Sequence, residues 1–183
     1  MNDEFIKMMV RRVVEVAVSG QALRNQGAPG VVDAAKDHLL EIDLREWAQL
    51  DAGSFGPRLD AETAALVEKL PADARSWGAA RKAINLVLRD AVYSADLCDH
   101  FSLRPLRPVL ELPLDKHVGA GIAEDAVKFN LSVPAWKQIK TLAPSTSATY
   151  QDAASTIATR RGIHRVDLDL YYWRASGTKP KRS

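Results

Sequence analysis

The sequence predicts an all-α fold, built as a compact domain of several helices. Nearly every apolar pattern in the chain has the spacing of a helix face, and capping residues precede several of these patterns. A chain of 183 residues with 46% hydrophobic residues is long enough to enclose a core of ordinary size. The charged fraction of 26% is typical of a soluble globular domain, and no stretch is apolar over the length needed to span a bilayer.

The first part of the chain predicts three helices separated by glycine and proline. The first helix covers residues 4–23, and it is closed by Gly20 and by the run Gly-Ala-Pro-Gly at residues 27–30. The second helix covers residues 31–50. Residues 53–57, Gly-Ser-Phe-Gly-Pro, interrupt the helical pattern, and Asp60 is then placed to cap a short third helix that ends at Leu70.

The strongest predicted helix begins at the N-cap Ser76 and runs from residue 77 to about residue 100. A proline-rich connector follows at residues 104–108. Asp115 stands where the next helix begins, and we expect that helix to run to about residue 129. Further helices are expected at residues 134–142, 147–161 and 165–174.

The last of these segments also has a strand pattern, because apolar residues alternate with other residues along it. No second strand is predicted to pair with it, and a lone strand would leave its backbone groups without hydrogen bonds. We therefore predict a helix. On a helix Asp167 and Asp169 diverge, whereas on a strand they would share a face that can bind a divalent metal.

Charge is unevenly distributed along the chain. Residues 1–75 hold nine Lys/Arg and thirteen Asp/Glu, a net charge of −4, whereas residues 76–183 hold sixteen and ten, a net charge of +6. A basic half is what a phosphate-binding face needs, and it predicts salt-sensitive binding to duplex DNA. Solvated helix faces also vary this much, so charge alone leaves both interpretations open.

The N-terminal sequence and the cysteine content predict a cytoplasmic protein. Residues 1–4 are acidic, and cationic residues interrupt the apolar ones that follow, unlike a signal peptide. The single cysteine, Cys98, excludes an internal disulfide and a cysteine-rich metal site, as expected in a reducing compartment. We expect one helical domain over residues 1–177, built either as a single unit or as two lobes that divide near 53–75, and a basic tail at 178–183.

Two residues are candidates for chemistry. A carboxylate at Asp115 can accept hydrogen bonds from the free backbone N–H groups of a first helical turn, which keeps it ionised and aimed. Lys82 lies in the early turns of the 77–100 helix among alanine, isoleucine and leucine, a setting in which an amine can serve as a nucleophile. Taken alone, each residue is better explained by an ordinary role: Asp115 as a helix cap and Lys82 as a solvated surface charge.

The order of these elements resembles the helix-hairpin-helix DNA glycosylases, most closely the 8-oxoguanine glycosylase/lyase branch. The resemblance covers about residues 60–174. It rests on Lys82, 33 residues before Asp115, and on the run Leu-Pro-Leu-Asp-Lys-His-Val at 112–118, where a proline-x-aspartate step leads into a His-Val helix start. The family's hairpin reads Leu-Pro-Gly-x-Gly, but residues 70–73 read Leu-Pro-Ala-Asp, so phosphate anchoring must use another part of the chain.

The resemblance implies a DNA N-glycosylase/AP lyase that acts on double-stranded DNA with a damaged or modified base, without cofactor or metal. Lys82 would attack C1′ of the sugar and form a Schiff base, while Asp115 would stabilise the positive charge that develops on the sugar. The base would be flipped into a pocket between aromatic or apolar side chains. The candidates for that pocket are His117, Tyr172 and Trp173.

Two other functions remain open at this point. The first is a non-catalytic helical protein that binds nucleic acid or acts as an adaptor. The second is a metal-dependent nuclease that uses Asp167 and Asp169. A thiol protease is not predicted, because Cys98 and His100 point nearly opposite ways on one helix.

Overall fold

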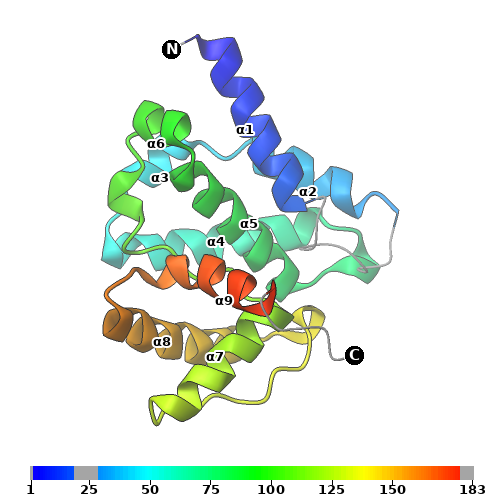
Figure 1. Ribbon diagram of the computed structural model, residues 1–183. Helices are drawn as coiled ribbons and strands as arrows, with labels where there is room; N and C mark the ends of the chain where they lie inside the picture. The colour runs from blue at the N-terminus through cyan, green and yellow to red at the C-terminus, as the bar shows by residue number, and fades with distance from the viewer. Residues whose placement is uncertain (1, 19–28, 178–183) are drawn as a thin grey trace.

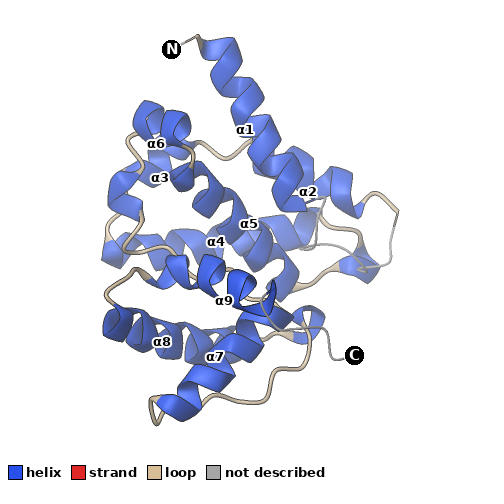
Figure 2. Cartoon of the chain, in the orientation of Figure 1, coloured by secondary structure: helices blue, strands red, loops and turns tan. Residues whose placement is uncertain are grey.

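The computed structural model describes residues 2–18 and 29–177, and within these residues all regular structure is helical, with no strand (Figure 2). The all-α prediction is confirmed. No helix in the described ranges is long and apolar enough to cross a membrane. The α-helices are α1 (Asp3–Ala17), α2 (Val31–Leu40), α3 (Leu44–Ala48), α4 (Ala52–Lys69), α5 (Trp77–Tyr93), α6 (Ala95–Phe101), α7 (Lys116–Lys128), α8 (Pro144–Arg161) and α9 (Leu168–Gly177). Short 3-10 turns lie at Ala72–Ala74, Arg104–Leu106, Ile139–Thr141 and Arg165–Asp167.

Several predicted helix boundaries are confirmed by their hydrogen bonds. The Ser76 hydroxyl accepts from the backbone N–H of Ala79 and caps α5, and the Asp115 carboxylate caps α7. Gly162 ends α8 in the left-handed conformation, with φ of 67°. The segment 165–174 is helical as predicted, because a 3-10 turn leads directly into α9.

Two predictions in the first part of the chain are wrong. Residues 31–50 form two helices, because Asp43 accepts a hydrogen bond from the backbone N–H of Arg45 and starts α3. Residues 53–57 do not break a helix but lie inside α4. The reason is local: the Asp51 side chain and Ser54 form a capping box that begins α4 upstream of the glycines.

The second part of the chain departs from the prediction at two places. The 77–100 helix is divided at Ser94, whose extended backbone separates α5 from α6. Residues 134–142 are irregular except for the turn Ile139–Thr141. The end of the predicted 4–23 helix beyond Val18 and the tail at 178–183 lie outside the described residues.

The buried apolar side chains form two clusters, and α5 lies between them. The first cluster joins α1–α6 and the connector as far as Leu110, and the second joins Leu112 to α7, α8 and α9. In Figure 1, α5 crosses the middle of the molecule, with α7 and α8 on one side and α1 and α6 on the other. Residues 53–75, where the sequence suggested a division into lobes, lie within the first cluster.

The contact between α9 and α7 gives a direct stability prediction. A Cβ built on Gly121 would lie 2.3 Å from Cδ1 of the Tyr172 ring. We therefore expect Gly121→Ala to destabilise the protein by about 1–3 kcal/mol, since a buried ring must shift. Gly53→Ala is the control: its Cβ meets an atom no closer than 3.6 Å, and the helix gains propensity. Urea denaturation measures both, and equal stability of the two variants would contradict the close packing of α9 on α7.

Candidate active site

The structure brings Lys82 and Asp115 into direct contact. The Lys82 Nζ atom donates a hydrogen bond to Oδ2 of Asp115 across 3.1 Å. Lys82 projects from a part of α5 in which every residue from Gly78 to Asn85 is buried, so it is not a surface lysine. Lys82 is 5% exposed and Asp115 is 8% exposed. Two residues far apart in sequence thus form a buried pair at the start of α7.

The Asp115 carboxylate is held by both of its oxygens. Oδ1 accepts from the backbone N–H groups of His117 and Val118, each at 2.9 Å, and this leaves Oδ2 to Lys82. The same oxygen atoms feel the positive end of the α7 dipole. Such a carboxylate is fixed in position and can stabilise a positive charge placed next to it.

A second buried ion pair lies beside the first. Arg89, seven residues after Lys82 and therefore on the same face of α5, forms an ion pair with Asp169 of α9. Burial raises the pKa of Asp169 to about 6, against the opposing effect of Arg89; the negative charge of Asp115 adds to the rise and the positive charge of Lys82 reduces it. These four residues form a charged cluster that joins α5, the start of α7 and α9.

Arg81, next to Lys82, has a structural role. Its guanidinium makes two hydrogen bonds of 2.8 Å to Glu111 and one of 2.7 Å to Asp60. Although burial opposes it, Arg81 holds the pKa of Glu111 below its usual value. These contacts fix the rotation of α5 about its axis, so that Lys82 faces Asp115.

The residues predicted to line a base pocket divide into two groups. His117, in the first turn of α7, contacts the ring of Trp173, with centroids 4.9 Å apart, and Trp173 is 37% exposed. These two rings lie at the end of α7 that carries Asp115. Tyr172 is instead part of the second cluster, and its hydroxyl donates to Oδ2 of Asp125 at 2.9 Å.

Little free space lies beside the Lys82–Asp115 pair. The cavity that Lys82 lines has no room for even one water-sized sphere. Ligand pockets usually enclose about 300–1,000 Å³. A flipped base therefore does not fit in this conformation, and a nucleotide reaches Lys82 only after the enclosing side chains move. The residues that line the cavity are Gly78, Arg81, Lys82, Asn85, Leu112, Leu114, Leu142, Ser147 and Gln151.

The two-aspartate metal site is not formed. Asp167 accepts from the Tyr93 hydroxyl at 2.6 Å and pairs with Arg107, whereas Asp169 pairs with Arg89. Helical geometry thus directs the two carboxylates to different partners. No group of three or more metal-ligating side chains occurs among residues 2–18 and 29–177.

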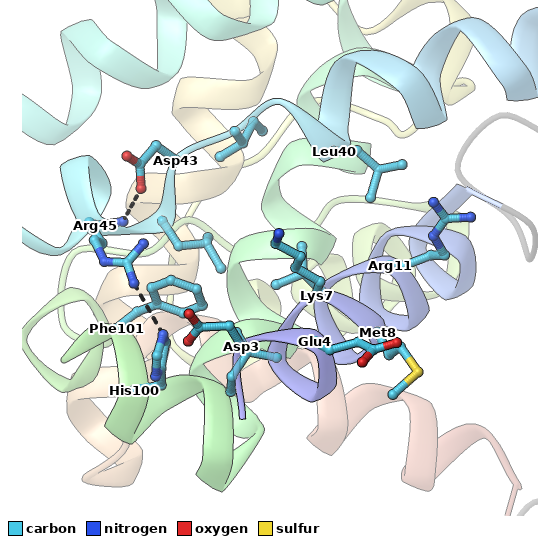
Figure 3. A pocket seen from close by; sticks show the side chains of 14 residues that line it. Asp3, Glu4, Lys7, Met8, Arg11, Leu40, Asp43, Arg45, His100 and Phe101 are labelled. Atoms are coloured by element: carbon cyan, nitrogen blue, oxygen red, sulfur yellow. Dashed lines mark hydrogen bonds between the residues drawn. The ribbon is translucent and has the colours of Figure 1, made fainter. Parts of the chain in front are cut away.

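A larger pocket lies elsewhere, between the N-terminal part of α1 and helices α3 and α6 (Figure 3). Its volume is about 810 Å³. On one wall, the Arg45 guanidinium contacts Nε2 of His100 at 3.2 Å and lies over the Phe101 ring. Three basic and three acidic side chains line it, so their charges balance: Lys7, Arg11, Arg45, Asp3, Glu4 and Asp43. No residue predicted from the sequence to carry chemistry lies in this pocket.

Comparison with protein-family models, with curated proteins and with solved structures finds no match to this chain. The likeness to helix-hairpin-helix glycosylases therefore stays a prediction from the sequence.

Proposed function

We propose that this protein is a DNA-base glycosylase with lyase activity, in which Lys82 is the nucleophile and Asp115 stabilises the sugar cation. The observation that carries the proposal is the 3.1 Å contact between Lys82 Nζ and Asp115 Oδ2. Once the enclosing side chains move, both side chains can reach one sugar, which the mechanism requires.

The chemistry uses each residue once. Lys82 first gives up its ammonium proton to solvent. The free amine then attacks C1′ of the nucleotide, the N-glycosidic bond breaks, and the base leaves with the bonding electron pair and takes up a proton. Positive charge develops on the sugar during this step, and the Asp115 carboxylate stabilises it. The ring then opens to a Schiff base between Lys82 and C1′, and elimination of the 3′ phosphate cuts the strand.

A non-catalytic helical nucleic-acid-binding protein is the second candidate. The observation that favours it is the lack of space beside Lys82, where the cavity has no room for even one water-sized sphere. In that case the pair serves to join α5 to the start of α7, and Asp115 is a helix cap with a buried counter-ion.

Borohydride trapping separates the two candidates. The full chain is incubated with a panel of duplexes, each carrying one damaged or modified base, with and without borohydride. We expect at least one duplex to lose its base and to form a reduced covalent adduct that peptide mass spectrometry locates at Lys82. Duplex binding without base release or adduct across the whole panel would instead support the binding protein.

A further inference from the structure

An irregular segment crosses the starts of the two helices that carry the buried pair. This crossing segment, residues 134–142, joins α7 to α8. Its Ile139 carbonyl oxygen would lie 2.3 Å from a Cβ on Gly78 of α5, and its Trp136 ring would lie 2.7 Å from a Cβ on Gly119 of α7. Glycine at both positions lets the segment lie directly on the first turns of α5 and α7.

The crossing segment is fixed at both ends. The Ser76 hydroxyl donates to the backbone carbonyl of Lys140 at 3.3 Å, and the Tyr150 hydroxyl donates to the carbonyl of Pro134 at 2.7 Å. The Trp136 ring also meets Tyr150 edge to face, with centroids 5.5 Å apart. The backbone between these contacts is thereby held in place, although most of it is not helical.

This fixed backbone presents positive charge to the solvent. Lys137 and Lys140 are exposed, and so is Lys116, the first residue of α7. Among the described residues none of these three lysines forms an ion pair, whereas Lys128, at the other end of α7, pairs with Glu124. Residues 126–151 contain no aspartate or glutamate. Nothing acidic in the crossing segment or its neighbours in sequence therefore offsets the charge.

We propose that the crossing segment is the phosphate-binding surface of this protein, with Lys137, Lys140 and Lys116 contacting the backbone of duplex DNA. This inference rests on the proposed function, because it supplies the anchor for the same site. Lys116 adjoins Asp115, and the crossing segment covers the turn of α5 just before Lys82. A DNA strand bound by these lysines lies beside the Lys82–Asp115 pair. Lysine suits this role because a backbone phosphate is recognised as a charge, without sequence information.

The test measures DNA binding without catalysis. Lys137→Ala/Lys140→Ala is prepared in the Lys82→Gln background, and fluorescence anisotropy gives the Kd for a duplex carrying a tetrahydrofuran abasic analogue over a series of salt concentrations. We expect Kd to rise roughly tenfold at about 0.1 M salt and the slope of log K against log salt to become shallower by about 2, since two phosphate contacts are lost. Adding Lys116→Ala should remove roughly one further contact.

Lys7→Ala/Arg12→Ala is the matched control. Both residues are exposed cations on α1, which packs on α2, α5 and α6, whereas the crossing segment lies on the first turns of α5 and α7. We expect this variant to keep the affinity and the salt slope of its parent. Circular dichroism verifies that all variants are folded.

The outcomes separate this inference from the proposed function. An unchanged salt slope in the crossing-segment variant, equal losses in both double variants, or no DNA binding by the parent would each overturn the inference. Loss confined to the crossing-segment variant supports it, even if borohydride traps no adduct in the otherwise unchanged protein. In that last case the glycosylase mechanism fails and the DNA-binding surface stands.

Discussion

Replacing Lys82 with glutamine is expected to abolish both base release and the borohydride-trapped adduct. The amide nitrogen is not nucleophilic, so neither the attack on C1′ nor the Schiff base can occur. Folding should survive, because a glutamine side chain can still donate a hydrogen bond to Oδ2 of Asp115. We expect the free energy of unfolding to fall by about 3–5 kcal/mol, because the buried Asp115 carboxylate loses its counter-ion. Single-turnover base release and urea denaturation measure the two quantities.

Lys128→Gln is the matched control for this substitution. Lys128 is exposed and pairs with Glu124 on the surface of α7, away from the charged cluster. Its replacement should leave adduct formation unchanged. If Lys82→Gln retains the adduct, or if the adduct maps to another lysine, Lys82 is not the nucleophile.

Replacing Asp115 with asparagine is expected to slow base release by roughly 100-fold or more, because an amide cannot offset positive charge on the sugar. Stability should also fall, and the structure changes the expected size of that effect. If Asp115 served only as an N-cap, its replacement by asparagine would lower the free energy of unfolding by about 1 kcal/mol or less. Because the substitution also removes the counter-ion of the buried Lys82, we expect the free energy of unfolding to fall by about 3–5 kcal/mol. Single-turnover kinetics and urea denaturation measure these two changes.

The double variant Lys82→Gln/Asp115→Asn separates catalysis from structure. Two amides can hydrogen-bond to each other without an unpaired charge, so part of the lost stability should return. Activity should remain absent, because the nucleophile and the carboxylate are both gone. Full activity of Asp115→Asn, with only the stability affected, would show that Asp115 is a cap and a counter-ion.

The sequence predicted the helical class and several helix starts because those features depend on neighbouring residues. Ser76 and Asp115 cap helices by bonding to N–H groups two or three residues away, so the signal is local. Wrong boundaries arose where local signals compete or where packing decides. Inside α4 the capping box at Asp51 prevails over the glycines and proline at 53–57. The crossing segment has apolar residues but is held by contacts with α5, α7 and α8 instead of its own helical hydrogen bonds.

The candidate site was predicted only in part, because the sequence carries local signals and not the packing of distant segments. Lys82 and Asp115 could be selected by residue type and order, and the structure brings them together. Arg89 and Asp169 were missed as a pair, since 80 residues separate them and their contact depends on how α9 packs. One signal was present in the sequence: Glu111 interrupts an apolar run, which is the mark of a buried acid that needs a partner such as Arg81.

By itself, therefore, the sequence determined that the chain is helical, where α5 and α7 begin, and that a lysine of suitable type lies in α5 and an aspartate of suitable type starts α7. The tertiary structure alone decided that the lysine is buried, that it bonds to the aspartate, and that little space is left beside them. The physical reason is the range of the interactions. Capping and periodicity act over a few residues, whereas burial and ion pairing depend on which helix faces meet, and the Arg81–Glu111 contact fixes that for α5.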